Sequence, residues 1–454
     1  MKTMARSLVL VFIGLFCMAT LTACANTDAS STIRTDLQSS AVPSSLAPSV
    51  PVPDTAQAID LSSIRYINYF NQGSSEEGYY YLRVRDDGTH NICYIDFATH
   101  QDIVLCNRLE CTHSDETCNS WIGSLYNTPY LITANDGLLV IYPGNAIIST
   151  TDSTVFGHVD HLDFNGSNRR TIASFDSLSM FTNYYAITDD YLFYQLDVYD
   201  STSASSKKFR IERLDLKTGE RTTIVESDSE ASFLIGASPS GLIITAFTFS
   251  EEIAGQAPEI SSTAYLVNAD TGEMKELIDW GNETEYELAG RDQLIYLTPD
   301  GVLHGVDYKT CQNTVLVDKP LQKFFKEQSI SGKTSFQLCF EVQNKVVVKG
   351  TVIGTDPSKT RDILFYIDLN DETVHALSLT SRAGNNNEGV STLNIACVAK
   401  EYLVVVTGYR SEVPAPGADS MAALYTSNIP QYALLSCENF FNNNPNYQSI
   451  QTIG

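Results

Sequence analysis

The sequence is poor in positive charge. Lysine and arginine total 29 against 54 aspartates and glutamates, so the 454 residues carry a formal net charge of −25. A protein that binds nucleic acid needs a basic surface to neutralise phosphates, and docking on anionic lipid by charge needs such a surface too. The composition therefore argues against nucleic acid as a partner and is typical of a soluble, exported domain.

Linear motifs of catalysis are missing as well. The sequence has no Gly-x-Ser-x-Gly elbow, no glycine-rich phosphate loop and no His-Glu-x-x-His pair. His158 and His161 stand three positions apart, a spacing that places them on opposite faces of a strand. Asp368 and Asp371 are paired carboxylates at a turn, where an aspartate commonly caps backbone donors. No catalytic residue is therefore predicted.

Helical periodicity and long apolar runs are scarce, with one exception at the N-terminus. Leu321 to Gln328 is the best candidate for a short helix, and the apolar runs after residue 24 are only strand-length. The exception begins with Lys2 and Arg6, continues through the apolar stretch from Leu8 to Phe16 and ends in small residues. This order is typical of a bacterial export signal, and the run is too short for a membrane span of about 20 apolar residues.

The end of this signal, Leu21-Thr22-Ala23-Cys24, resembles the lipobox of bacterial lipoproteins. The resemblance implies a signal peptide over residues 1–23, cleavage before Cys24 and a diacylglyceryl thioether on that sulfur. Two acyl chains hold a protein on a bilayer stably, where a single chain binds marginally. The alternative is an ordinary secretory signal with a chance cysteine. We expect a lipid-anchored protein of the cell membrane that faces outside the cytoplasm.

Residues 24–60 are rich in serine, threonine, alanine and proline and show no apolar period. A segment of this composition cannot bury enough apolar surface to offset the entropy lost on ordering. We therefore predict a disordered tether with extended character near its prolines, which sets the following domain off the membrane.

The sequence is rich in one repeated feature, a short strand that ends in a polar turn. Asp or Asn opens the turn and can accept hydrogen bonds from backbone N–H groups two or three residues on, and glycine often supplies the positive φ of the reversal. The copies lie at 96–99, 163–166, 215–219, 268–272, 307–310 and 368–371, with a degenerate seventh near 426–428. A repeat of roughly 40–65 residues indicates a propeller or a related array.

Apolar runs rich in β-branched and aromatic residues flank every turn and bring each unit to four strands. We therefore predict an all-β fold, a seven-bladed β-propeller over residues 61–454. The expected blades are 61–120, 121–177, 178–229, 230–281, 282–328, 329–385 and 386–454. Long inserts between the second and third strands of blades three, four, six and seven would fall on one face of the disc.

Three of the ten cysteines gather around a histidine. Cys106, Cys111, His113 and Cys118 form the pattern C-x4-C-x-H-x4-C, which matches a Cys3His zinc set in ligand type although not the spacing of a standard zinc knuckle. In an exported protein a disulfide such as Cys111–Cys118 is an alternative, and free thiols in a reducing, anaerobic setting are another. All three interpretations remain open at this point.

The remaining cysteines of the predicted propeller are expected to be structural. Cys311 falls in a turn, Cys339 and Cys397 in first strands of consecutive blades, and Cys437 near the end of the sequence. A small thiol suits the packed interior of a sheet. A bridge between Cys339 and Cys397 is conceivable, because innermost strands converge on the axis.

Three features together resemble a known group: the lipobox, the element from Tyr94 to Cys118, and the turn of blade two from Asp163 to Arg170. The combination is similar to TolB-like β-propeller lipoproteins of Gram-positive, clostridial-type gut anaerobes. The likeness covers residues 1–175 by motif and the remainder by repeat pattern. It implies a surface-anchored propeller without an established reaction.

Two functions from different classes follow. The preferred one is a non-enzymatic binding or scaffold protein that holds a peptide, glycan or envelope partner on its loop-bearing face or in its axial channel. The alternative is a surface hydrolase or lyase whose carboxylates converge from different blades at the channel mouth, a site that needs no linear motif. Trp121, Trp280 and the 24 tyrosines could line a sugar site, but propeller cores also use many aromatic residues. No cofactor is expected beyond a possible structural zinc.

Overall fold

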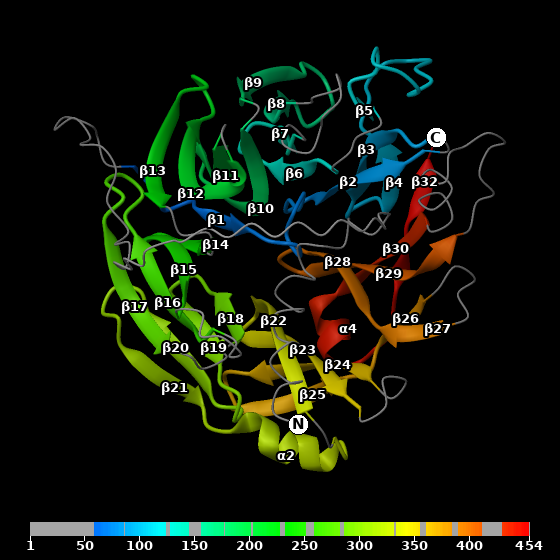
Figure 1. The fold of residues 1–454 in the computed structure, drawn as a ribbon. Helices are drawn as coiled ribbons and strands as arrows, with labels where there is room; N and C mark the ends of the chain where they lie inside the picture. The colour runs from blue at the N-terminus through cyan, green and yellow to red at the C-terminus, as the bar shows by residue number, and fades with distance from the viewer. Residues whose placement is uncertain are drawn as a thin grey trace, which may run out of the picture.

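The computed structural model describes residues 59–85, 87–123, 128–144, 156–176, 178–200, 203–227, 232–250, 258–281, 286–330, 333–354, 360–383, 389–410 and 429–453. Seven sheets of four or more strands stand in a ring, numbered here as blades 1 to 7 (Figure 1). The prediction of a seven-bladed β-propeller is confirmed. The predicted signal peptide, most of the tether, and Cys24 lie outside the described residues.

Blades 2 to 4 each contain an antiparallel sheet of four consecutive strands. Blade 2 consists of β6 (Tyr130–Thr133), β7 (Leu138–Tyr142), β8 (His158–Leu162) and β9 (Arg170–Ser174). Blade 3 has β10 (Ser179–Ile187), β11 (Tyr191–Asp200), β12 (Ser203–Asp215) and β13 (Arg221–Ser227). Blade 4 has β14 (Ser232–Ser238), β15 (Gly241–Phe249), β16 (Ile260–Val267) and β17 (Met274–Gly281).

Blades 5 to 7 follow the same order. Blade 5 has β18 (Tyr286–Ala289), β19 (Gln293–Leu297), β20 (Leu303–Asp307) and β21 (Asn313–Val317), and blade 6 has β22 (Lys333–Val342), β23 (Lys345–Ile353), β24 (Arg361–Asp368) and β25 (Thr373–Leu377). Blade 7 has β28 (Asn394–Val398), β29 (Tyr402–Arg410), β30 (Ile429–Ser436) and β31 (Gln448–Ser449). A separate hairpin, β26 (Thr380–Ala383) and β27 (Gly389–Thr392), lies between blades 6 and 7 in the sequence.

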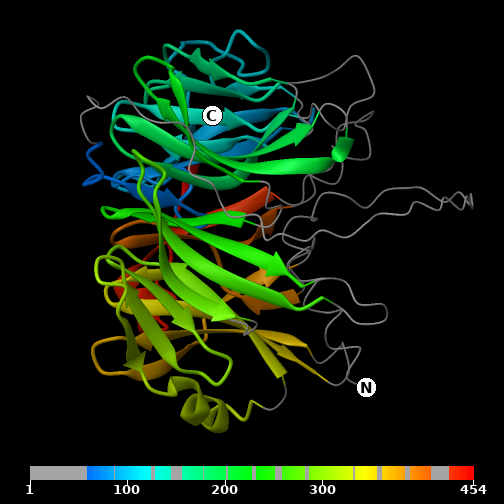
Figure 2. The ribbon, with the colours of Figure 1, turned by 60° about the vertical axis from the view of Figure 1, so that its left-hand side comes forward.

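Two short helices accompany the sheets in the described residues. α2 (Pro320–Glu327) lies at the outer rim of the ring and buries Leu321 and Phe324 (Figure 2); its position agrees with the predicted helix. α4 (Cys437–Phe441) follows β30 in blade 7 and is capped by Ser436, whose hydroxyl accepts from the backbone N–H of Asn439. No helix in the described part of the chain is long and apolar enough to cross a membrane.

The predicted turns join the third and fourth strands of blades 2 to 6, and in blade 1 such a turn joins the strands at 90–96 and 101–104. In blade 3, Asp215 Oδ1 accepts from the backbone N–H groups of Lys217 and Thr218 at 2.9 and 2.8 Å, and blades 1, 4 and 5 repeat this pair of bonds around Asp96, Asn268 and Asp307. The degenerate seventh copy, near 426–428, falls outside the described residues. In blade 7 the strand after β30 is reached through α4 rather than through a turn of this kind, because Ser436 caps a helix there.

The interior lies between blades. The second strands of blades 2 to 7 each contain a run of buried apolar residues; all five residues of β7 and the first six of β15 are buried. Side chains on one face of such a strand pack on the preceding blade and those on the other face on the following blade. Leu139 and Ile141 of blade 2, for example, share a buried cluster with Tyr185 of blade 3.

Blade 1 is assembled from both ends of the described chain. β2 (Gly78–Val84), β3 (His90–Asp96) and β4 (Gln101–Val104) form three antiparallel strands, and the two-residue β5 (Trp121–Ile122) pairs with the start of β3. The fourth position belongs to β32 (Gln451–Ile453), which pairs with β4 in parallel. The boundary predicted for blade 7, 386–454, is therefore wrong at its end, since the last strand completes blade 1.

Residues 61–77 were also expected in blade 1, and the structure places them elsewhere. β1 (Arg65–Ile67) pairs with the inner edge of β10 in blade 3. An Arg65 guanidinium N–H donates to Thr133 O of blade 2, and Tyr66 Oη donates to Leu234 O of blade 4 at 3.1 Å. The segment that leads into β2 therefore starts on the far side of the ring (Figure 1).

The same segment then continues across the ring to blades 6 and 7. The Phe70 ring meets Phe340 of blade 6 edge to face at 5.3 Å, and Phe70 O accepts from Val398 N of blade 7. Its contacts on blades 2, 3 and 7 fall at Thr133, Ile187 and Val398, where innermost strands end. Residues 59–75 therefore cross one end of the axial channel and tie five blades together; we call them the crossing segment.

Candidate functional site

The Cys/His group lies on the loop that leaves blade 1 after β4. Asn91 Nδ2 and Arg85 Nη1, from the neighbouring hairpin, both donate to the carbonyl oxygen of His113, at 2.9 and 3.1 Å. At the loop's far end Ile92 N donates to Ser120 O at 2.8 Å. These bonds fix the loop on blade 1 at its middle and at its end.

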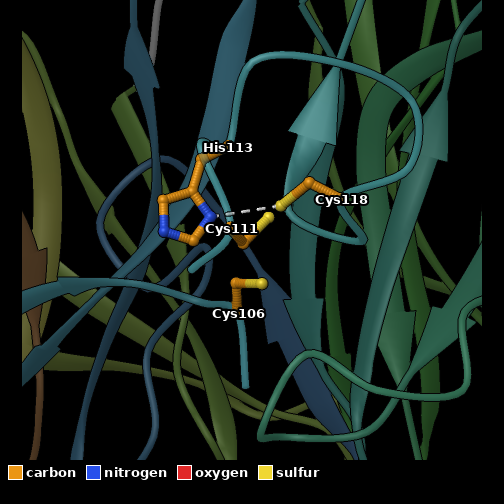
Figure 3. Close-up of side chains that lie close together, drawn as sticks. All are labelled: Cys106, Cys111, His113 and Cys118. Atoms are coloured by element: carbon orange, nitrogen blue, oxygen red, sulfur yellow. Dashed lines mark hydrogen bonds between the residues drawn. The ribbon is translucent and has the colours of Figure 1, made fainter. Parts of the chain in front are cut away.

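Cys106, Cys111, His113 and Cys118 converge (Figure 3). One ligand atom from each residue, three Sγ and one imidazole nitrogen, lies within 4.8 Å of every other. Glu110 and His113 adopt positive φ of 58° and 55°, which is uncommon for residues other than glycine. These bends return the chain on itself, so residues that span 13 positions in the sequence reach one point.

The surroundings shift the pKa values of the Cys111 and Cys106 thiols in opposite directions. The backbone N–H of His113 is the main reason why the pKa of Cys111 lies below its usual value, and the N–H of Arg108 approaches Cys106 in the same way. Burial nevertheless raises the pKa of Cys106 to about 11. Cys118 is 1% exposed, with its Sγ 3.1 Å from Ser120 Oγ and 3.3 Å from His113 Nδ1.

A metal ion fits this donor set better than a disulfide does. All eight cysteines in the described residues have free thiols. A bridge between any two clustered thiols would leave the third thiol and the imidazole without a role, whereas a tetrahedral ion uses all four donors. Zinc bound at about 2.3 Å to each sulfur would hold the sulfur atoms about 3.8 Å apart, which agrees with the 4.8 Å limit. Burial also lowers the pKa of His113, so its imidazole stays neutral, the form that binds metals.

The histidine pair and the paired carboxylates of the sequence have separate partners in the structure. His158 stacks on Tyr142 with ring centroids 4.1 Å apart, and His161 Nε2 contacts Asp136 Oδ1 at 3.1 Å. Asp368 accepts from Asn370 N at 2.9 Å and pairs with Lys345 Nζ at 2.9 Å, as a turn residue does. These roles agree with the structural interpretation of both pairs.

A second feature was not predicted: a pocket of about 360 Å³ at the inner edge of blade 1. Its walls come from β2, from the residues before β6, and from β28, β29 and β30 of blade 7. Tyr69 and Gln72 of the crossing segment also line it. The sequence shows no signal for this pocket except the abundance of tyrosine, because its parts lie more than 300 residues apart.

Tyrosine rings dominate this pocket. The rings of Tyr79 and Tyr81 are nearly parallel, 10° apart with centroids at 5.8 Å, and Tyr432 meets both of them edge to face. Tyr69 is 66% exposed, and Asn394 Nδ2 donates to Tyr409 Oη at 3.2 Å. We call this feature the tyrosine pocket.

No protein-family model and no curated protein sequence matches the chain. Among solved structures, it is similar to an oligogalacturonate lyase from Vibrio parahaemolyticus, with 12% identity and a TM-score of 0.47 over 83% of this chain and 92% of that one. It is also similar to a puromycin-hydrolysing peptidase of Mycobacterium tuberculosis, with 10% identity and a TM-score of 0.48 over 90% of this chain and 56% of that one.

A third similar structure is the β-propeller domain of the trilobed protease from Pyrococcus furiosus, with 11% identity and a TM-score of 0.39 over 68% of this chain and 81% of that one. None of these likenesses carries an activity over to this chain. The assignment of this chain therefore stops at its fold, a seven-bladed β-propeller.

Proposed function

We propose that the protein is a lipid-anchored, non-enzymatic binding protein that holds a peptide, glycan or envelope partner outside the cytoplasm. The observation that carries the proposal is the tyrosine pocket, which combines aromatic faces with polar groups at the channel. Largely preformed pockets with apolar walls and a few placed polar groups are the usual form of a binding site. The crossing segment supports a fixed scaffold, since it ties five blades across one end of the ring.

In this proposal Cys24 carries the anchor and residues 25–58 form the tether. The partner is a protein or a glycan, not a nucleic acid, because the chain carries a net charge of −25. Ile59 follows the tether, and its backbone N–H donates to Asp270 Oδ2 of blade 4 at 3.0 Å. The tether therefore reaches the propeller at the end that the crossing segment occupies.

We also propose that Cys106, Cys111, His113 and Cys118 hold a structural zinc ion. Thiolates and an imidazole suit zinc, and a site with four protein ligands leaves no open position for a substrate. The ion would bind the loop to blade 1 at a third place, between the anchors at His113 O and Ser120 O.

The experiment is membrane fractionation of the native host, or of a lipoprotein-competent bacterium, that expresses the full chain. The wild-type protein is expected in the membrane fraction with a diacylglyceryl mass on Cys24, and Cys24→Ala is expected in the soluble fraction. Metal analysis of the purified protein is expected to give one zinc per chain. A soluble, unlipidated wild-type protein would refute the anchor, and protein that folds fully without metal would refute the zinc site.

One observation favours the alternative of a surface hydrolase or lyase. Glu287 on β18, the innermost strand of blade 5, is held by Thr245 Oγ1, which donates to its carboxylate at 3.1 Å. Burial raises the pKa of Glu287 to about 7, a range that suits a general acid. Incubation with polysaccharide and peptide libraries tests this alternative: turnover lost in Glu287→Gln would establish it and would displace the binding proposal.

A further inference from the structure

Among the described residues, those that line the tyrosine pocket include no charged side chain. Its lining consists of Tyr69, Gln72, Tyr79, Tyr80, Tyr81, Leu82, Thr128, Pro129, Leu131, Asn394, Ala396, Val406, Tyr409, Pro430 and Tyr432. The chain has 29 Lys and Arg residues and 54 Asp and Glu residues. A pocket lined by neutral side chains therefore differs from the rest of the chain and restricts the charge of its ligand. A charged ligand would lose its hydration without gaining an ion pair, so the pocket suits a neutral one.

The pocket also offers hydrogen-bonding groups around its aromatic rings. Burial raises the pKa of Tyr79 and of Tyr432 well above the ordinary value, so both phenols stay protonated and can donate as well as accept. The amides of Asn394 and Gln72 add groups of both kinds. A purely apolar ligand would leave these groups without partners, which costs affinity.

The arrangement of the tyrosine rings determines which ligand shape fits the pocket. Tyr79 and Tyr81 present nearly parallel rings, and Tyr432 stands edge-on to them. A tyrosine combines a broad apolar face with one polar tip. A pyranose ring has the matching form, because its C–H bonds make an apolar face while its hydroxyl groups project around the rim. The volume of about 360 Å³ lies at the lower end of the range for ligand pockets and suits one or two sugar rings.

The crossing segment forms one end of the pocket. It lies where the innermost strands end, whereas Asn394, Leu131 and the residues before β6 lie where innermost strands begin. Tyr69 and Gln72 therefore line the pocket at the end of the ring that the crossing segment occupies, and Tyr69 is 66% exposed there. A ligand in the pocket can therefore contact both the crossing segment and the blades.

We propose that the tyrosine pocket binds a neutral sugar unit of an uncharged glycan. The inference rests on the proposed binding function and names its site and ligand class. It predicts that the pocket binds glycans rather than peptides, and neutral glycans rather than acidic glycans.

The test is calorimetric titration of the full chain with neutral hexasaccharides of glucose, xylose and N-acetylglucosamine, and with hexagalacturonate as the charged counterpart. Binding of at least one neutral hexasaccharide is expected, with no binding of hexagalacturonate. Tyr69→Ala should weaken binding by about three- to tenfold, the usual worth of one aromatic contact. Tyr69 is 66% exposed, so the variant is expected to fold normally.

Phe249→Ala is the matched control, because Phe249 is also an exposed aromatic residue, at 54%, but lies on blade 4 outside the pocket. Its affinity should equal that of the wild type. The proposal is overturned if every neutral hexasaccharide fails to bind below about 10 mM, or if Tyr69→Ala binds as tightly as Phe249→Ala. Binding of a neutral, aromatic-rich hexapeptide that is sensitive to Tyr69→Ala, with no sugar binding, would overturn the glycan assignment and leave the binding function standing.

Discussion

Blade 1 and blade 5 have the same four-stranded plan and reach it by different means. Blade 5 runs without interruption through β18, β19, β20 and β21, and each strand pairs with the one before it. Blade 1 takes three strands from residues 78–104 and its fourth from residues 451–453. It also carries the Cys/His loop and borders the tyrosine pocket.

The difference shows which blade depends on contacts with residues outside its own hairpins. Blade 5 is held by turns whose partners lie a few residues apart, such as Asp307 with Thr310. Blade 1 is the seam of the ring, and it is held by a distant strand, by the loop with the four donors of the proposed metal site and by the crossing segment. We therefore expect changes at the seam to cost more stability than comparable changes near blade 5.

The largest effect is expected at Cys118. Cys118→Ser should lower the free energy of unfolding in zinc-containing buffer by about 3–5 kcal/mol, because it removes one ligand of the proposed zinc ion. Cys397→Ser is the control, since Cys397 is equally buried but lies in a strand of blade 7. It should cost about 1–3 kcal/mol, the price of a buried hydroxyl.

Urea denaturation with and without a chelator measures this difference. The chelator should bring the wild type down to the stability of Cys118→Ser and leave that variant unchanged. A wild type that is indifferent to the chelator would contradict the metal centre and would return the cluster to the thiol or disulfide interpretations.

A smaller effect is expected from two glycines. Gly166 has a φ of 78°, and a Cβ there would lie 2.2 Å from the carbonyl oxygen of Leu105, next to the Cys/His loop. Gly281, at the end of blade 4, has a φ of 62° and no atom within 4 Å of such a Cβ. Both alanine variants should lose about 1–2 kcal/mol from the left-handed backbone, and Gly166→Ala should lose about 1–3 kcal/mol more from the clash.

Thermal denaturation of the two glycine variants checks this expectation. Equal losses of stability in the two variants would mean that the turn of blade 2 does not approach Leu105 as closely as the structure shows.

The smallest effect is expected from Glu287 on blade 5. Its pKa is raised to about 7, mainly by burial, whereas a glutamate in the unfolded chain titrates near pH 4.3. The folded state therefore binds the extra proton between these values, and stability should fall as the pH rises from about 4.3 to about 7, by about 1–3 kcal/mol in total. Below this window the group contributes no penalty.

Glu287→Gln should remove that pH dependence and be more stable than the wild type at pH 8. Glu273→Gln, at an exposed turn of blade 4, is the control and should keep the wild-type slope. Parallel pH profiles for all three proteins would show that Glu287 is not held in a desolvated site.

The sequence was sufficient for what depends on local chemistry. Four of the turns that open with Asp or Asn are fixed by hydrogen bonds from residues two and three positions on, so Asp215 and Asp307 could be recognised without their partners. The Cys/His group was recognised for the same reason, since its four donors span only 13 positions. Strand-length apolar runs then gave the blade count, because a buried strand shows its character in a few residues.

What the sequence could not supply depends on contacts across the ring. Ile59 bonds to Asp270, 211 residues away, and the three residues of β1 are too few to show a period. β32 pairs with β4 although about 350 residues separate them. The tyrosine pocket could not be predicted for the same reason, since Tyr79 and Tyr432 meet only once the ring is closed.

The parallel pairing of β32 with β4 also constrains the order in which the blades can fold. β4 is synthesised early, yet its outer edge has no partner until the residues of β32 have been synthesised. An unpaired edge of this kind is a site for aggregation. We therefore expect that blades 2 to 6 form first, and that the edge of β4 needs protection by chaperones until β32 pairs with it.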